Sequence, residues 1–305
     1  TTGVGVGGFA YDYPPYQNGG DGNDLNGGYG GEGTIWQGAG GGGGGFFGGG
    51  GGAGGGNANG GGGGGSSKST SNIVSFGTAN TNGNGSLTIT TYDLAIYLDA
   101  GNSNSYGGSG TTWFDLSGNG SNATLNGVNF SSSNISSMNF TTSDADFNLD
   151  LGTTSVITLE LWVKTISFND GMYFGFDRYD VWTENGAIGF NTAVGDLYGI
   201  PNTIVTNLEI IDNWKHLVFV MYSGSKTNNK IYVNGVLQSL SQVESTFNND
   251  NANFNNGVGA INGWKINSNF FRLSQNLSVF KIYRNELSSQ QILNLFNLEK
   301  SRFGL

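Results

Sequence analysis

The chain contains no cysteine and little charge. Its 305 residues include 12 Lys and Arg, 22 Asp and Glu and one His, so charged residues make up 11% of the sequence, against about 25% in an average protein. Without cysteine the protein forms no disulfide and no thiolate-ligated zinc or iron–sulfur centre. Secreted animal domains often carry disulfides. A viral particle made in a reducing cytoplasm, or a bacterial exported protein, fits this composition better.

Positive charge is especially scarce, because the net charge is −10 and no Lys or Arg occurs before Lys68. A nucleic-acid-binding protein needs a basic face to neutralise phosphates, so nucleic acid is excluded as a partner. The sequence also lacks a run of about 18 apolar residues, which excludes a transmembrane helix and membrane insertion. The chain begins with Thr1 rather than Met, and we expect a processed chain or the C-terminal portion of a longer one.

Glycine is the residue in excess, with 56 copies. Its longest runs lie at 40–45, 48–52 and 60–65. A flexible linker is one interpretation, because glycine loses the most entropy on ordering. Aromatic residues such as Trp36 and the pair Phe46-Phe47 interrupt this region. They favour a packed module, since such side chains are sticky in solvent.

The glycine runs, the Phe pair and the phrase NGNGSLTIT (82–90) resemble the glycine-rich domains of phage fibre tips and bacterial surface proteins. The resemblance implies bundled polyglycine II helices. Such helices have three residues per turn and no internal hydrogen bonds, so their backbone groups must pair between neighbours. We therefore assign residues 1–86 to a glycine-rich module for assembly or adhesion, and residues 87–305 to a second domain.

The second domain shows short hydrophobic segments separated by Asn, Gly, Ser and Thr turns, a pattern that predicts an all-β sandwich or jelly roll. The predicted strands are 86–90, 94–99, 139–142, 157–165, 173–176, 181–183, 187–190, 215–222, 230–233, 236–240, 271–273 and 277–283. Asn234-Gly235 predicts a tight hairpin turn, because both turn residues must take positive φ.

One short helix is predicted near the C-terminus. Ser288 followed by Gln291 has the spacing of a capping box, in which each residue satisfies a backbone N–H near the other. Ile292, Leu295 and Phe296 then fall on one helical face. A helix this short is stabilised mainly by docking on the sandwich.

Several phrases of the second domain carry a family resemblance. They are LDAGN (98–102), SYGGSGTTW (105–113), DLSGNGSN (115–122), TLELWV (158–163), WKHLVF (214–219), KIYVNG (230–235), FKIYRNELS (280–288) and SRFGL (301–305). In this order they resemble the laminin-G-like jelly-roll branch of the concanavalin A-like lectin/glucanase superfamily. The resemblance implies an antiparallel β-sandwich that recognises glycans. The last phrase is similar to virion-associated versions in tailed phages.

The superfamily includes glycanases, which place two carboxylates about 5–5.5 Å apart through a Glu-x-Asp-x-x-Glu strand motif. Glu160 has Trp162 and Thr165 at the matching positions. The only histidine, His216, would need a Ser nucleophile and an acid beside it to form a triad. Its position looks structural in similar sequences. We therefore predict that the protein is not an enzyme.

Calcium is the one ion that the sequence suggests, because Ca²⁺ takes six to eight oxygen ligands from carboxylates, amides and carbonyls. One candidate set is Asp99, Asp115, Asn119 and Asn122, and a second is Asp144, Asp146 and Asp150. The first set is favoured. The alternative is that these residues only cap turns. No other cofactor is predicted.

A glycan site on this fold needs an aromatic platform beside Asn or Asp side chains. The candidate aromatic residues are Tyr173, Tyr179, Trp182, Tyr198 and Trp264. Each of them could instead pack in the core or at its rim, and the sequence does not choose among them.

Together these features predict a non-enzymatic structural and recognition protein of a virion surface, such as a phage tail fibre, spike or capsid decoration. The glycine-rich module would form a homo-oligomer, with a trimer favoured, and contact other virion proteins. The sandwich would bind a cell-surface glycan. A bacterial extracellular adhesin or filament subunit is the alternative, and a glycan hydrolase comes third.

Overall fold

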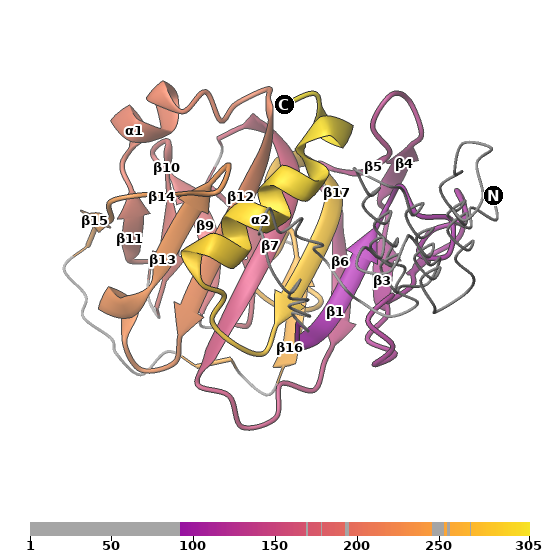
Figure 1. The fold of residues 1–305 in the computed structure, drawn as a ribbon, viewed down its shortest axis with the longest axis horizontal. Coiled ribbons are helices and arrows are strands. Elements are labelled where there is room, and N and C mark those ends of the chain that lie inside the picture. Colours follow the sequence, from indigo (N-terminus) through magenta and orange to yellow (C-terminus); the bar gives the residue numbers. More distant parts are fainter. Residues whose placement is uncertain are drawn as a thin grey trace, which may run out of the picture. The chain divides into compact units, whose positions relative to one another are not determined.

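Two antiparallel sheets pack face to face and form a β-sandwich (Figure 1). The computed structural model describes residues 92–168, 170–177, 179–192, 195–245, 253–254, 257–268 and 270–305. The predicted glycine-rich module at 1–86 and the strand predicted at 86–90 lie outside the described residues.

The first sheet contains eight strands among the described residues, in the order β14-β13-β12-β7-β17-β5-β4, with β1 also pairing with β17. Their bounds are β1 Leu94–Asp99, β4 Asn129–Ser131, β5 Ser137–Phe140, β7 Val156–Ser167, β12 Trp214–Tyr222, β13 Lys230–Val233, β14 Val236–Leu237 and β17 Ser274–Tyr283. The long central strands β7, β12 and β17 are almost continuously buried because both of their faces are covered.

The second sheet contains nine strands in the described part of the chain, in the order β15-β11-β10-β9-β8-β16-β6-β3-β2. Their bounds are β2 Thr112–Trp113, β3 Ala123–Asn126, β6 Asp144–Asn148, β8 Gly171–Gly175, β9 Asp180–Glu184, β10 Ala187–Asn191, β11 Leu197–Ile200, β15 Ser241–Glu244 and β16 Val258–Ile261. Each sheet therefore ends in a short strand, β14 in one and β15 in the other.

The core lies between the facing sheets and is rich in aromatic rings. Phe174 of β8 and Phe176, which follows that strand, make an edge-to-face contact with ring centroids 4.5 Å apart, and Phe280 of the first sheet lies 5.9 Å from Phe174. All three side chains are fully buried. Burying a side chain of this size stabilises the fold by about 1.5–3 kcal/mol, so such rings hold the two sheets together.

The predicted C-terminal helix is confirmed as α2, Ser289–Glu299. Ser288 and Gln291 form the capping box, with Gln291 N donating to Ser288 Oγ at 3.3 Å and Ser288 N donating to Gln291 Oε1 at 2.8 Å. In Figure 1 the helix crosses the outer face of the first sheet over β7, β12 and β17. Its Phe296 stacks on Trp162 of β7, so α2 covers a sheet face that would otherwise expose aromatic surface.

The predicted Asn234-Gly235 hairpin is also confirmed. Both residues have positive φ, 50° and 81°, and Val233 pairs with Val236 across the turn. Asn and Gly tolerate this left-handed backbone better than other residues. The tight turn places the β14 edge directly beside β13.

Some elements differ from the prediction. The segment 271–273 contributes only an isolated bridge between Met172 and Arg272, and the last long strand begins at Ser274 instead. A second helix, α1 at Asn202–Asn207, begins after Pro201 and had no signal in the sequence pattern. Short strands such as β6 and β16 were also missed, because their Asp, Asn and Gly residues are typical of turns.

Candidate functional site

A pocket of about 510 Å³ opens where the two sheets end. The chain leaves β14 at Leu237, crosses through residues 238–240 and enters β15, which pairs with β11. This crossing forms one wall of what we call the edge pocket. Its lining is Tyr198, Tyr222, Thr227, Asn228, Asn229, Lys230, Leu237, Gln238 and Leu240.

The 3₁₀ helix Lys226–Asn228 supplies the polar wall of the edge pocket. The Lys226 side chain points inward and is buried, with its Nζ 3.2 Å from Asp196 Oδ2 and 2.9 Å from Gln242 Oε1. These two contacts tie the turn to the second sheet. The next residues, Thr227 and Asn228, are consequently held at the surface with their side chains exposed.

The aromatic part of the edge pocket comes from two strands. Tyr198 lies on β11, opposite Phe190 of β10 and Gln242 of β15, and its side chain is half-buried. Tyr222 ends β12 and is also half-buried. A tyrosine in this state presents an apolar ring and a polar hydroxyl together, which suits a ligand with both kinds of surface.

An ion group borders the edge pocket. Glu286 accepts hydrogen bonds from the Tyr222 hydroxyl and from Lys230 Nζ, and we call these three residues the rim ion group. Burial opposes ionisation of Glu286, but the bonds from Lys230 and Tyr222 outweigh it and lower the Glu286 pKa. The hydrogen bond to Glu286 raises the Lys230 pKa. Both groups therefore stay charged at neutral pH and neutralise each other.

A second group of the same residue types lies on the first sheet beneath α2. Glu160 accepts from Lys281 Nζ at 3.1 Å and from the Tyr283 hydroxyl, and its Oε1 lies 3.2 Å from His216 Nε2. We call Glu160, Lys281 and Tyr283 the buried ion group. Lys281 also bonds Glu299 of α2 at 2.8 Å, so the group links the sheet to the helix.

Burial alone would keep Glu160 neutral, but the Lys281 charge and the hydrogen bonds from His216 and Tyr283 lower its pKa. Attraction to Glu160 and Glu299 likewise outweighs desolvation and raises the Lys281 pKa. Glu160 and His216 are both fully buried. They have no opening towards a substrate, and the geometry makes them part of a structural network.

The predicted glycan aromatics separate into two kinds. Tyr173 and Tyr179 are only 1% and 0% exposed; the first bonds Thr165 and the second bonds Asn229 and Tyr222. Neither ring presents a face to solvent, which corrects their selection as stacking platforms. Trp182 is 5% exposed and its Nε1 donates to the Asp196 carbonyl.

Tyr198 and Trp264 are the two predicted aromatics with partly exposed side chains. Lys265 Nζ lies 4.0 Å from the centre of the Trp264 ring, so a cation already covers that ring. Tyr198 is the one that lies in the edge pocket. The sequence had no signal for its pocket neighbours Asn228, Asn229 and Gln238, which come from segments that only the fold brings together.

The favoured calcium residues make many bonds within the protein. Asp115 accepts from the backbone of Tyr97, Ser117 and Ser121 and from the Ser117 hydroxyl. Asn122 Oδ1 accepts from Asp115 N, whereas Asn119 Nδ2 donates to Leu94 O. These bonds fold the 115–122 loop against β1.

Asp99 is held separately by Arg302, with Oδ1–Nη2 and Oδ2–Nη1 distances of 2.6 and 2.9 Å. In the second set, Asp144 pairs with Arg272 at 3.1 Å, and burial together with the Asp144 charge raises the Asp146 pKa. The described residues contain no group of three or more His, Cys, Asp or Glu arranged to hold a metal ion. Calcium binding stays a prediction.

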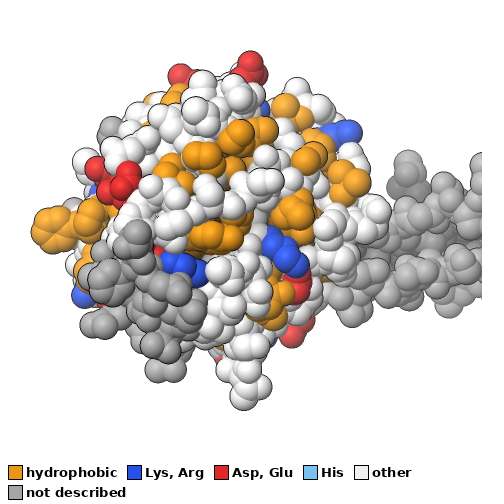
Figure 2. Space-filling view, turned by 90° about the vertical axis from the view of Figure 1, so that its left-hand side faces the viewer, with side chains coloured by type: hydrophobic (Ala, Val, Ile, Leu, Met, Phe, Trp, Pro, Cys, Tyr) orange, Lys and Arg blue, Asp and Glu red, His pale blue; other side chains and the backbone are white. Residues whose placement is uncertain are grey.

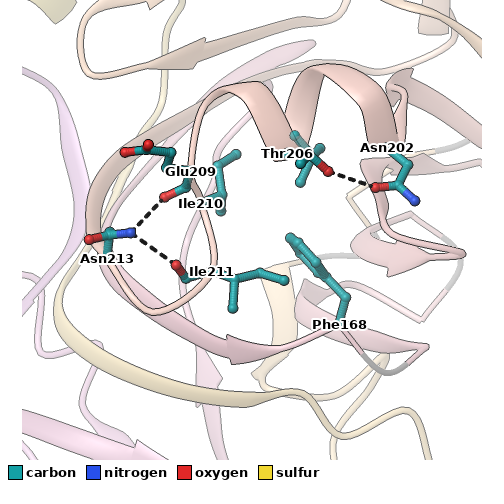
Figure 3. A pocket seen from close by; sticks show the side chains of 8 residues that line it. Phe168, Asn202, Thr206, Glu209, Ile210, Ile211 and Asn213 are labelled. Atoms are coloured by element: carbon teal, nitrogen blue, oxygen red, sulfur yellow. Dashed lines mark hydrogen bonds between the residues drawn. The ribbon is translucent and has the colours of Figure 1, made fainter.

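A second pocket of about 450 Å³ lies beside α1. Phe168 and Ile211 point into it below the helix, and Asn213 Nδ2 donates to the carbonyls of Glu209 and Ile211 at 3.1 and 3.0 Å (Figure 3). The Asn213 amide thus holds the loop after α1, whereas Asn202 Oδ1 accepts from the Thr206 hydroxyl within the helix. Both apolar and polar side chains line this second pocket.

Residues 117–293 match the laminin-G-type family model described as the concanavalin A-like lectin/glucanases superfamily. The match covers more than half of the chain, and the chain belongs to this superfamily. No curated protein sequence matches the chain. Among the described residues, no helix has the length and apolar character needed to cross a membrane.

Solved structures with a similar fold are larger than this chain. The receptor-binding domain of the botulinum neurotoxin C/D mosaic serotype is 15% identical, with a TM-score of 0.47, and the match covers 67% of this chain and 51% of that one. The binding domain of Paraclostridial mosquitocidal protein 1 is 15% identical, with a TM-score of 0.47, and the match covers 67% of this chain and 52% of that one. The binding domain of botulinum neurotoxin DC in complex with SialylT is 14% identical, with a TM-score of 0.45, and the match covers 67% of this chain and 51% of that one. The chain thus spans about half the length of the solved chains that it matches.

Proposed function

We propose that the sandwich is a non-catalytic recognition module that binds a glycan in the edge pocket. The observation that carries the proposal is one pocket that joins the half-buried Tyr198 ring to the amide side chains of Asn228, Asn229 and Gln238. A sugar has C–H faces that pack on an aromatic ring, and hydroxyls that amides can bond as donors and acceptors. Membership of a superfamily described by its lectins agrees with this function.

The surface around the edge pocket supports recognition of a neutral ligand. Figure 2 shows the side of the molecule on which β11 and β15 lie, with separate hydrophobic patches, mostly uncharged polar atoms between them and scattered charges. Lys230, the one charged residue among the described residues of the lining, is paired with Glu286. Long-range electrostatic steering is weak on such a surface, so short-range packing and hydrogen bonds would select the ligand.

The same lining favours binding over glycan hydrolysis. Retaining glycosidases hold two carboxyl groups about 5–5.5 Å apart at the scissile bond. Among the described residues that line the edge pocket there is neither Asp nor Glu. Glu160, the strand residue that was compared with the glucanase motif, is not in this pocket but in the buried ion group.

For the biological setting we propose a virion surface, where the chain would act as a tail fibre, spike or capsid decoration. The support is the glycine-rich composition of residues 1–86 and the absence of cysteine. A bacterial extracellular adhesin or filament subunit is the second candidate. Light scattering of the full chain tests the homotrimer that this setting favours, which would have about three times the mass of the 31.9 kDa chain.

A glycan array probed with the full chain tests the proposed function, followed by titration calorimetry on the best ligand. Tyr198→Ala removes the ring from the pocket. We expect affinity to fall about thirtyfold, because truncating a central aromatic contact costs about 2 kcal/mol or more. Asn228→Ala, at an exposed position, should weaken binding less while leaving the fold unchanged.

Phe114→Ala is the matched control, because this aromatic side chain is 50% exposed and does not line the edge pocket. It should bind like the unaltered protein. Unchanged affinity in both Tyr198→Ala and Asn228→Ala would move the glycan site elsewhere. Mass spectrometry of the recovered glycan tests for hydrolysis. A shortened product would show that the protein is a glycan hydrolase and would overturn the non-catalytic function proposed above.

A further inference from the structure

Phe270 is the most exposed large hydrophobic side chain among the described residues, with 69% of its surface accessible. Phe271 beside it is 46% exposed, and its ring makes an edge-to-face contact with Trp182 of β9 at a centroid distance of 6.4 Å. Trp264 and Val243 pack against the small hydrophobic cluster to which Trp182 belongs. We call these five residues the aromatic patch. Single exposed hydrophobic residues are common on proteins, but adjoining ones mark interaction sites.

Hydrogen bonds pin the loop between β16 and β17 that carries the two phenylalanines. Arg272 Nη1 donates to the Asn262 carbonyl at 2.6 Å, and Arg272 Nη2 lies 3.1 Å from Asp144 Oδ2. The fully buried Asn262 accepts from Leu273 N at 3.0 Å through its Oδ1. A partner would therefore meet aromatic side chains on a loop whose base is already fixed, which lowers the entropic cost of binding.

The backbone of Phe271 is strained. Its φ is 60°, a left-handed conformation that is rare for a bulky side chain. Pairing with β8 holds the residue in place, because Met172 N donates to Phe271 O at 2.8 Å and Met172 forms a bridge with Arg272. Strain of this kind clusters at functional sites, and here it sets the position of an exposed ring.

The aromatic patch and the edge pocket lie on opposite faces of the second sheet. Leu197 and Tyr198 are neighbours on β11, so their side chains point to opposite faces. Leu197 belongs to the hydrophobic cluster beneath the patch, whereas Tyr198 lines the edge pocket. The patch is thus a second surface, separate from the proposed glycan site.

Acidic side chains border the aromatic patch. Asp170 directly precedes β8, Glu184 ends β9 two residues after Trp182, and Glu244 ends β15 directly after Val243. The Glu184 pKa is raised, first by burial and then by the negative charges of Glu244 and Asp170. Both carboxylates therefore lie close enough to repel Glu184, and a cation brought among them would relieve the repulsion.

These charges decide which partner fits the aromatic patch. A second copy of the chain, packed patch to patch, would bring the same carboxylates together, and the net charge of −10 also opposes self-association. An anionic membrane surface is repelled for the same reason. A protein segment with Lys or Arg beside apolar residues complements both the rings and the carboxylates.

The chain itself contains the combination that such a partner would form. Lys265 Nζ lies 4.0 Å from the centre of the Trp264 ring and 3.5 Å from Asp177 Oδ1. An aromatic face and a carboxylate thus attract one cation together. Phe270 and Phe271 likewise offer exposed rings near carboxylates, where a Lys or Arg of a partner is held in the same way.

We propose that the aromatic patch docks a basic and apolar segment of a partner protein. Apolar side chains of the segment pack on Phe270 and Phe271, and its Lys or Arg side chains pair with the carboxylates of Asp170, Glu184 and Glu244. The inference goes beyond the proposed glycan binding, because it concerns a different surface and a different class of ligand.

The test measures binding of short synthetic peptides to the full chain by fluorescence anisotropy. One set of peptides combines Lys with Leu, a second set replaces Lys by Glu, and a third set replaces Leu by Ser. Only the Lys–Leu peptides should bind, and their affinity should fall as added salt screens the charges. In Phe270→Ser the affinity should fall about tenfold, because the most exposed ring of the patch is lost.

Phe114→Ser is the matched control, because Phe114 is also an exposed phenylalanine, at 50%, and follows β2 at the opposite edge of the second sheet. This variant should bind the Lys–Leu peptides like the unaltered protein. Asp170→Asn removes an exposed carboxylate and should weaken binding about threefold at low salt and less at high salt. A thermal unfolding curve shows that each variant is folded.

Several results would overturn the inference. Failure of every Lys–Leu peptide does so, and equal affinity of these peptides for Phe270→Ser and the unaltered protein places their site elsewhere. Binding of the Glu–Leu peptides shows that the carboxylates do not select the partner. Binding to phosphatidylcholine vesicles that is lost in Phe270→Ser assigns the patch to a membrane. A dimer that Phe270→Ser dissociates, measured by light scattering, assigns it to a second copy of the chain.

Discussion

The molecule contains the same three residue types in two environments. The buried ion group, Glu160, Lys281 and Tyr283, has 0%, 4% and 1% of its surface exposed. In the rim ion group, the side chains of Lys230 and Glu286 are 37% and 33% exposed. The two groups make the same bonds, in which Lys and Tyr donate to Glu.

The difference lies in what happens when a partner is lost. Water can solvate a charge at the rim, so an exposed ion pair contributes little to stability. A buried charge that loses its partner remains desolvated, and that is strongly destabilising. The buried ion group therefore has to stay intact to hold α2 on the sheet. The rim ion group beside the edge pocket can exchange its partners at little cost in stability.

Lys281→Met gives the largest expected effect. The variant leaves Glu160 buried without its ammonium partner and removes the bond to Glu299 of α2. The free energy of unfolding should fall by about 3–5 kcal/mol, the usual cost of breaking a buried pair from one side. Denaturant unfolding monitored by tryptophan fluorescence measures the change.

Lys230→Met is the matched control at the rim, where the ion pair is partly exposed. It should lower the free energy of unfolding by only about 0–1 kcal/mol. Equal losses in the two variants would break the comparison, because burial would then not distinguish the groups.

A smaller effect is expected from acid. The ordinary pKa of a Glu side chain is 4.5, and in the fold the pKa of Glu160 falls to about 2. Burial opposes ionisation, but the Lys281 charge and the hydrogen bonds from His216 and Tyr283 outweigh it. As the pH falls below 4.5, Glu160 takes up a proton in the unfolded chain but stays ionised in the folded protein. The stabilisation is therefore fully present above pH 4.5 and is lost as the pH falls towards 2. Glu160→Gln should be less stable at pH 7 and should lose less stability between pH 5 and pH 2.

Asp180 serves as the control, because its pKa is shifted in the opposite direction from that of Glu160. Its burial raises the Asp180 pKa well above 3.8, so its contribution favours the fold at low pH and weakens as the pH rises. Asp180→Asn should therefore gain stability relative to the unaltered protein as the pH increases. Thermal melts from pH 2 to pH 8 measure both variants. Parallel profiles for Glu160→Gln and the unaltered protein would show that Glu160 does not titrate as described.

Strands with strong local signals were predicted closely. The predicted strand 230–233 coincides with β13, and 157–165 lies inside β7. These segments are rich in β-branched and aromatic residues, which favour strands wherever the segment lies in the fold. By contrast β16, with the sequence VGAI, joins its sheet through backbone pairing with β6 and β8, which no local pattern encodes.

The candidate site was predicted less completely. The sequence predicts Tyr198 as a glycan-site residue, but it predicts Tyr173 and Tyr179 equally, and these two are buried in the core. An aromatic residue in a strand looks the same in sequence whether it faces the core or a pocket. The distinction depends on which sheet face the neighbouring strands cover.

The sequence by itself determined the superfamily, the hairpin at Asn234-Gly235 and the cap at Ser288. Each of these depends on residues a few positions apart, or on phrases in a constant order. The tertiary structure alone decided that Tyr198, Asn229 and Leu237 share one pocket, and that Glu160 is sealed beneath α2. The physical reason is that strand pairing and sheet packing join segments distant in the chain, and burial then decides whether a polar group stabilises the fold or meets a ligand.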